Sequence, residues 1–374
     1  MTEEKSWRES TISPEISLRI TIIRFPLIVG VVMGHSYGVL VKYSDHVIGN
    51  SKVSWFAIFI QVLISKVIAP TVIPLFFLMA GFLFFYNFKL EWRTLFKKYR
   101  TRFHSLFIPY LFWNTATLGF YFIITSIPIL SNYVDGTGMN KFIANYTFVN
   151  YVDAFVGFKG YPIAYQFWFI RELIILVILS PLISLIAKRR SSLFLLIIAG
   201  CWFMNNSIST PILRFSSVLF FYVGALIAIK KYAINWVDTY GGKILIIYCF
   251  CAVTEAVIVI FSGNNPILPY LDKFNLLLGT ISAWYLTGRV ANHASANKIS
   301  KLSVYSFFVY AAHEPFLRGI RKIAYSALDP SNAISITFLY FICPIMTISI
   351  MLLAAFYLRT YYPRIYKVIN GGRA

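Results

Sequence analysis

Apolar runs long enough to cross a membrane recur along most of the chain and are separated by short polar stretches. About 30 Å of hydrocarbon takes roughly 20 helical residues to cross, and the pattern predicts about ten such helices. The expected crossings are residues 17–41, 72–88, 106–128, 166–187, 192–208, 212–229, 243–261, 270–290, 302–323 and 334–358. We therefore expect an all-α polytopic integral membrane protein.

The stretch at residues 53–69 is also apolar, but a separate crossing there would put the basic segment KLEWRTLFKKYRTR on the outside. Because Lys- and Arg-rich loops stay in the cytoplasm, we interpret 53–88 as one crossing preceded by a partly embedded or surface segment. Pro70 and Pro74 are expected to break the helix between these parts. Both termini and the basic loops then lie in the cytoplasm.

Composition supports the membrane class and limits the partners. Hydrophobic residues make up 58% of the chain and aromatic residues 18%, well above the averages of soluble proteins. The net charge of +20 would suit a nucleic-acid-binding protein. However, the basic residues lie in short stretches between apolar runs rather than on one domain face. We expect a lipid bilayer and no nucleic acid as a partner.

The cysteines and the absence of linkers indicate a single unit. All four cysteines fall in apolar segments without C-x-x-C spacing, which argues against a disulfide framework or a metal site: Cys201, Cys249, Cys251 and Cys343. No internal repeat or low-complexity linker interrupts the pattern. We expect one membrane-embedded domain over residues 1–374, with no appended soluble domain.

Ionisable residues inside the expected crossings are few, and each is a functional hypothesis because burying it in the membrane is costly. Among the 14 acidic residues, Glu172, Glu255 and Glu314 lie in the interior of these crossings, and Asp272 lies at the start of the one at 270–290. Of the five histidines, only His35 and His313 do.

Arg24 and His35 share the first crossing. Eleven residues turn a helix by about 20° past three full turns, so the two side chains lie on one face, about 16 Å apart along the axis. In one interpretation Arg24 extends to the inner headgroups while His35 bonds to a neighbouring carbonyl. In the other, both residues face a functional site.

The spacing of Arg24 and His35 matches the Arg-x10-His pattern of the membrane-bound acyltransferase-3 family, and four further stretches resemble family segments in the same order. They are PLFFLMAGFLFF (74–85), RTRFHSLFIPYLFWN (100–114), FWFIRELIILVILSPLI (167–183) and SVYSFFVYAAHEPFL (303–317). One departure lies in the basic loop, where Arg102 is followed three positions later by Ser105 instead of a second arginine. The resemblance covers residues 19 to about 358.

The resemblance implies an acyltransferase of the bacterial inner (plasma) membrane. Such an enzyme transfers an acyl group, usually acetyl, from acyl-CoA as co-substrate, with no bound cofactor, to a hydroxyl of a cell-surface polysaccharide or its lipid-linked precursor. Imidazole is the usual general base for a hydroxyl at neutral pH and also accepts acyl groups, so His35 is expected to act as base or acyl carrier. Glu314 is a candidate orienting carboxylate, or a structural partner of a buried arginine.

Basic and aromatic residues supply candidates for the two substrates. Arginine forks suit phosphate oxygens, so donor binding is expected from Arg24, Lys98, Arg100 and Arg102, although cytoplasmic loops are basic in any case. Acceptor contact or structural support is expected from Trp168, Arg171, Glu172 and His313.

Two other classes of function remain open from the residues. A transporter or flippase of lipid-linked sugars also has many crossings and buried charges, although it often shows pseudo-symmetric halves, which this sequence lacks. A glycosyltransferase or polymerase would favour acidic pairs in a large outer loop, where this chain has only isolated acids. Consumption of acyl-CoA distinguishes an acyltransferase from both.

Overall fold

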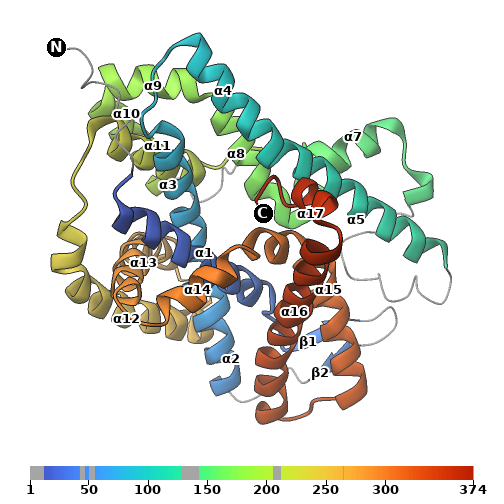
Figure 1. The fold of residues 1–374 in the computed structure, drawn as a ribbon. Helices are drawn as coiled ribbons and strands as arrows, with labels where there is room; N and C mark the ends of the chain where they lie inside the picture. Colours follow the sequence, from blue (N-terminus) through green and yellow to red (C-terminus); the bar gives the residue numbers. More distant parts are fainter. Residues whose placement is uncertain are drawn as a thin grey trace, which may run out of the picture.

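The computed structural model describes residues 12–42, 47–49, 55–127, 143–204, 212–263 and 265–373. These parts are helical apart from one short antiparallel hairpin, in which Leu40 pairs with Gly49 (Figure 1). The hairpin consists of β1 (Leu40–Lys42) and β2 (Val47–Gly49). The expected all-α class is confirmed.

The helices follow the order of the apolar runs. The first half of the chain forms α1 (Pro14–His35), α2 (Trp55–Gln61), α3 (Val72–Phe85), α4 (Trp92–Arg102), α5 (Ile108–Ser126), α7 (Phe148–Val156), α8 (Trp168–Ile178) and α9 (Ser180–Arg189). The second half forms α10 (Ser191–Met204), α11 (Phe215–Lys230), α12 (Trp236–Phe261), α13 (Leu268–Ala291), α14 (Ala296–Ser303), α15 (Ser306–Leu328), α16 (Ala333–Tyr361) and α17 (Pro363–Ile369). Short 3-10 turns lie at η2 (Ala69–Thr71), η4 (Ile143–Asn145) and η5 (Tyr165–Phe167), and π-helical turns at η1 (Val62–Ile68) and η3 (Phe103–Phe107).

Several of these helices are long and apolar enough to cross a membrane, which together with the composition makes this a multi-pass membrane protein. Within the described residues, five segments qualify by length and composition: Pro14–His35, Trp55–Phe85, Trp92–Ser126, Trp236–Phe261 and Ala333–Tyr361. The expected crossing at 166–187 is a helix pair, α8 and α9, bent by 62°. The described part of the expected crossing at 192–208 is the shorter apolar helix α10, and that at 212–229 corresponds to the shorter apolar helix α11, while residues 205–208 lie outside the described part of the chain.

The helix break expected from the sequence at Pro70 and Pro74 is not found. The chain stays helical from Trp55 to Phe85. It passes the prolines by changing its winding, from the π-helical η1 to the 3-10 turn η2 and then to α3. Proline lacks the amide proton of a regular α-helix, and these local changes of winding accommodate it without ending the segment.

The closest helix packing joins α3 to α11. Gly81 and Gly224 lie where the two backbones meet. A Cβ atom at Gly81 would collide with the carbonyl oxygen of Phe221, and one at Gly224 would collide with that of Leu78. Small residues allow such close contact between helices in membranes, where van der Waals packing drives association. α3 also packs against α1.

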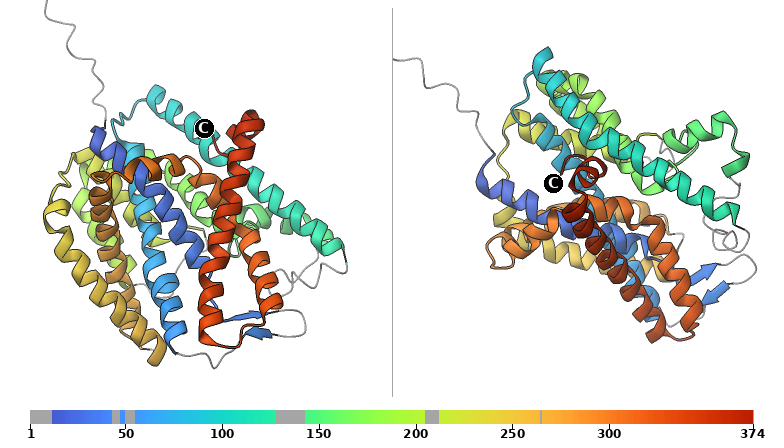
Figure 2. Two further views of the ribbon diagram at one scale, coloured as in Figure 1. Left: turned by 60° about the horizontal axis from the view of Figure 1, so that its bottom comes forward. Right: turned by 45° about the vertical axis from the view of Figure 1, so that its right-hand side comes forward.

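α1 runs through the centre of the bundle and packs against α13, α14 and α15. In the left view of Figure 2, the start of α1 and the C-terminal helix α17 lie at the same end of the molecule. The β-hairpin and the turn between α15 and α16 lie at the opposite end. α1 therefore carries its side chains from one end of the bundle into its interior.

Candidate active site

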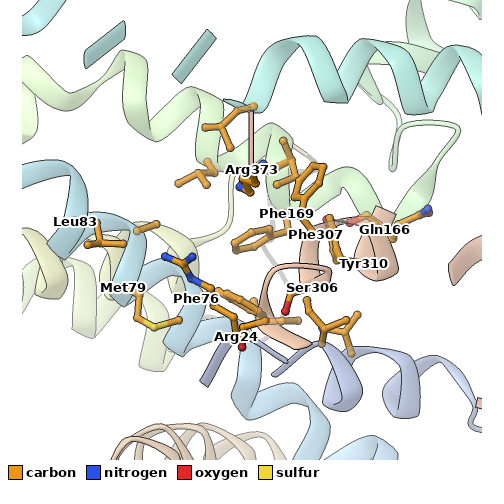
Figure 3. Close-up of a pocket in the computed structure, with 18 of the residues that line it drawn as sticks. Arg24, Phe76, Met79, Leu83, Gln166, Phe169, Ser306, Phe307, Tyr310 and Arg373 are labelled. Atoms are coloured by element: carbon orange, nitrogen blue, oxygen red, sulfur yellow. Dashed lines mark hydrogen bonds between the residues drawn. The ribbon is translucent and has the colours of Figure 1, made fainter. Parts of the chain in front are cut away.

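A cavity of about 440 Å³ runs beside α1 and is lined by residues from helices far apart in the sequence. Arg24 and His35, both on α1, line the same cavity. Its walls are largely aromatic and aliphatic, with Phe76 packed against Phe169 at a centroid distance of 5.6 Å. Figure 3 shows Arg24 and Arg373 entering it from different walls. The expected common face of Arg24 and His35 thus looks into one space.

His35 is the last residue of α1, and its ring is held from the side by Tyr165. The Tyr165 hydroxyl lies 3.1 Å from His35 Nδ1 and donates a 2.9 Å hydrogen bond to Glu314 Oε1. The neighbouring Gln166 is anchored to α15, since its amide donates to the carbonyl oxygens of Ala311 (3.0 Å) and Glu314 (3.3 Å). The turn η5 therefore bridges α1 and α15.

Glu314 occupies a local break in α15. Its backbone is extended (φ −109°, ψ 136°) within an otherwise helical segment. The following Pro315 explains this, because the proline ring disfavours the α conformation of the residue before it. The carboxylate is buried and lies 3.5 Å from Arg318 Nε, one helical turn on. The break thus gives a buried carboxylate two partners, a hydroxyl and a guanidinium.

These contacts determine how protons are arranged around His35. A tyrosine hydroxyl carries one proton, and an ionised carboxylate only accepts hydrogen bonds. When the Glu314 carboxylate is ionised, the Tyr165 proton is directed to it, the Tyr165 oxygen accepts, and Nδ1 of His35 carries the proton that it donates. In a neutral imidazole the other nitrogen, Nε2, then holds the lone pair.

His313 lies next to this group but has a different environment. Its ring centroid is 5.4 Å from that of His35, and its side chain is completely buried. Nδ1 lies 2.6 Å from the carbonyl oxygen of Tyr310, which requires the proton on Nδ1. His313 is therefore fixed to its own helix and supports the ring of His35 by packing.

The expected donor-binding residues divide into two groups. Arg24 and Arg102, the last residue of α4, both line the cavity, and the side chain of Arg24 is accessible there. Lys98 instead donates to the carbonyl oxygens of Phe84 and Tyr86 at the end of α3, and Arg100 is exposed on α4. Neither Lys98 nor Arg100 lines the cavity.

The polar residues of α8 make local contacts. Arg171 donates to the carbonyl oxygens of Val156 (2.9 Å), Gly157 (2.9 Å) and Gly160 (3.1 Å), and so holds the turn after α7. The guanidinium of Arg214 lies 3.6 Å from the ring centroid of Trp168. Trp168 also lines the cavity with its buried side chain.

Glu172 is fully buried between α8 and α11. Its Oε2 accepts a hydrogen bond from the Ser217 hydroxyl, and Oε1 lies 3.7 Å from Arg214 Nε. An unpaired buried carboxylate would be costly, and these partners compensate its charge. Glu172 and Arg171 thus connect α8 to α11 and to the turn after α7.

Comparison with known proteins adds the decisive observation. The sequence profile of the acyltransferase-3 family, described as an acyltransferase domain, matches residues 18–357. The chain belongs to the acyltransferase-3 family. This confirms the resemblance carried by the five sequence stretches, and it favours acyl transfer over the transporter and polymerase alternatives.

One curated relative is the succinoglycan biosynthesis protein ExoH of Rhizobium meliloti (strain 1021). It is 23% identical over 371 residues, which cover 96% of this chain and 93% of the relative. No solved structure matches the chain.

Three side chains of this acyltransferase-3 site were not predicted from the sequence: Tyr165, Arg318 and Arg373. Arg318 follows Glu314 by four residues, a spacing that places both on one helix face and was a usable signal. Tyr165 lies just before the FWFIREL stretch, but a lone tyrosine beside an apolar run indicates nothing specific. Arg373 follows the last apolar helix, where basic residues are expected in any cytoplasmic segment.

Proposed function

We propose that this protein transfers an acyl group, most simply acetyl, from acyl-CoA to a hydroxyl of a cell-surface polysaccharide or its lipid-linked precursor, in the bacterial inner membrane. The observation that carries the proposal is the single cavity lined by Arg24, Arg102 and His35. It combines guanidinium groups suited to phosphates with an imidazole suited to activating a hydroxyl. The family assignment supports the same chemistry.

The shape and lining of the cavity suit a long donor with a charged head. Guanidinium forks bind phosphate oxygens in pairs, so Arg24 and Arg102 are placed to hold the phosphates of coenzyme A. About 16 Å of helix separates Arg24 from His35, and the pantetheine arm extends along the apolar wall that includes Phe76 and Phe169. The thioester at the end of the arm then lies near the imidazole.

In the chemical step His35 acts as general base. Nε2 takes the proton from the acceptor hydroxyl while the oxygen attacks the thioester carbonyl, which forms the new C–O bond. Collapse of the tetrahedral intermediate breaks the C–S bond, and the imidazolium returns its proton to the leaving thiolate. The products are the ester and free coenzyme A. Glu314, acting through Tyr165, stabilises the imidazolium that forms in between.

A polysaccharide acceptor is supported by the relative from Rhizobium meliloti, whose name assigns it to succinoglycan biosynthesis. A sugar hydroxyl is a poor nucleophile at neutral pH and needs a base. The hydrogen-bonded group around His35 provides one.

The proposed topology has about ten crossings with both ends of the chain in the cytoplasm. The start of α1 and the helix α17 lie at one end of the molecule (Figure 2), which supports an even number of crossings. The basic helix α4 lies at that end too. This orientation places Arg24 and Arg102 toward the side where cytoplasmic acyl-CoA arrives.

Purified protein in lipid nanodiscs tests the proposal directly. With radiolabelled acetyl-CoA and surface glycan isolated from a strain lacking the gene, we expect label in the glycan and one free thiol released per ester formed. Label on the protein without acceptor would indicate an acyl-histidine intermediate instead of general-base catalysis. If wild-type protein releases no thiol from any short-chain acyl-CoA, the acyl-CoA donor is wrong.

A further inference from the structure

Three guanidinium groups line the cavity, and they come from three separate segments: Arg24 from α1, Arg102 from α4 and Arg373 from the segment after α17. Within the described residues, none of the three forms an ion pair with a carboxylate. The ion pairs present there belong to other arginines, such as Arg19 and Arg318. Three positive charges therefore line one cavity, and no carboxylate of the described residues forms an ion pair with any of them.

This arrangement is unfavourable for the free protein. Burial, together with the positive charges of Arg102 and Arg24, lowers the pKa of the Arg373 guanidinium to about 10. Mutual repulsion and burial both oppose the charged form. Groups held in such surroundings are characteristic of binding sites, because a ligand of opposite charge removes the cost.

The chain positions Arg373 by several specific contacts. The Trp113 indole on α5 donates a 3.1 Å hydrogen bond to the carbonyl oxygen of Ile369, at the end of α17. The side chain of Asn370 is fully buried and donates to the carbonyl oxygen of Arg373. Gly371 then takes a left-handed conformation (φ +65°), and a Cβ there would lie 2.7 Å from Arg373 Nη1.

The Arg373 guanidinium also lies 4.3 Å from the ring centroid of Phe307, in cation–π distance. Phe307 itself lines the cavity, as Figure 3 shows. The planar fork is thus stacked on an aromatic wall with nitrogen atoms left for a ligand. Its hydrogen bond from Nη1 to the carbonyl oxygen of Asn370 uses only part of its donors.

We propose that Arg373 is a phosphate-binding residue of the donor site and, with Arg24 and Arg102, completes a three-arginine pocket for the phosphate groups of acyl-CoA. This rests on the proposed function. Coenzyme A carries a diphosphate and a separate 3′-phosphate, so it offers enough anionic oxygens for three guanidinium forks. The segment after α17 is therefore part of the active site.

Steady-state kinetics with two donors tests this inference. We compare wild type, Arg373→Gln, Arg373→Lys and the control Arg364→Gln, which alters an exposed arginine on α17. The donors are acetyl-CoA and acetyl-pantetheine, which lacks phosphates. Arg373→Gln should raise KM for acetyl-CoA about 10- to 100-fold and leave the kinetics with acetyl-pantetheine unchanged. The KM of Arg373→Lys for acetyl-CoA should lie between the values of the wild type and Arg373→Gln, because lysine keeps the charge but lacks the guanidinium fork.

Thermal unfolding gives a second readout that does not depend on activity. Coenzyme A should raise Tm of the wild type, since a ligand that binds only the folded state stabilises it. In Arg373→Gln this rise should disappear, while Tm without ligand should be equal to or above that of the wild type, because one repelling charge is gone. Arg364→Gln should behave as the wild type.

The outcomes separate this inference from the proposed function. If the wild type uses acetyl-CoA and Arg373→Gln has an unchanged KM for it, only the role of Arg373 is overturned. A wild type that neither consumes acetyl-CoA nor gains Tm from coenzyme A overturns the donor itself. If nanodiscs with anionic phospholipid, but not coenzyme A, raise Tm in an Arg373-dependent way, the three arginines bind lipid phosphate and the inference is wrong.

Discussion

The Tyr165 hydroxyl lies 3.1 Å from Nδ1 of His35 and joins the end of α1 to the broken helix α15. The same hydroxyl donates a hydrogen bond to Glu314 at 2.9 Å, so Tyr165 links the Glu314 carboxylate to the His35 imidazole. The arrangement resembles the role of an orienting carboxylate behind a catalytic histidine. In the proposed mechanism Tyr165 is a positioning residue.

Tyr165→Phe removes this link while keeping the ring. A hydrogen bond to a charged group is worth about 1.5–3 kcal/mol, so kcat should fall about 10- to 150-fold with KM for acyl-CoA unchanged. Tyr240→Phe, at an exposed tyrosine of α12, is the matched control. A rise in KM with unchanged kcat would show that Tyr165 binds donor instead of orienting His35.

His35→Gln and His35→Asn separate catalysis from packing. Both amides keep a donor and an acceptor, and interhelical hydrogen bonds in membranes are worth only about 0.6–2 kcal/mol, so both variants should insert and accumulate normally. Loss of a positioned base typically costs about 10²–10⁴-fold in rate. Glycan acylation is the measurement, with the exposed His104→Gln as control. Near wild-type acylation would give His35 a structural role.

Glu314→Gln keeps an acceptor for the Tyr165 hydroxyl but removes the negative charge. The imidazolium of His35 then loses its stabilising partner, and kcat should fall at least about 10-fold. Glu255→Gln is the control, because Glu255 is a buried carboxylate outside the cavity lining, hydrogen-bonded to Asn275 at 2.5 Å. Equal kcat values for the two variants would exclude an electrostatic role of Glu314.

Arg24→Lys tests the donor end of the cavity. Lysine keeps the charge but replaces a bidentate fork by a point charge, so the Kd for coenzyme A should rise while the protein remains active at saturating donor. Arg189→Lys, at the exposed end of α9, should bind as the wild type does. Unchanged donor affinity in active, correctly inserted Arg24→Lys would remove Arg24 from the phosphate site.

Cysteine labelling checks the proposed orientation in a background without the four native cysteines. A membrane-impermeant maleimide should label Ser326→Cys, at the end of α15, in intact spheroplasts. It should label Arg93→Cys, on α4, only after permeabilisation. Both positions are exposed, and α4 and the end of α15 lie near opposite ends of the molecule (Figure 2). The reverse pattern would place the three-arginine end of the cavity outside the cell.

The sequence by itself determined the class of the protein and the first half of its site. The long apolar runs predict membrane-spanning helices. In lipid, backbone N–H and C=O groups find hydrogen-bond partners only within a helix or a closed barrel. Eleven residues of helical spacing were sufficient to place Arg24 and His35 on one face. The order of five stretches identified the family. The winding through Pro70 was not predictable, since neighbouring helices decide whether a proline ends a membrane helix.

Only the tertiary structure decided which side chains meet His35 and Arg24. Tyr165 reaches His35 across 130 positions of sequence and Glu314 across 149. Helical periodicity states which face a residue occupies but not which helix packs against that face. Arg373 could not be distinguished from any other basic residue after a membrane helix until the turn at Gly371 directed it into the cavity. The site therefore depends on packing between helices that are far apart in the sequence. Which helices pack together is determined by the fit of their surfaces, and this cannot be read from one segment alone.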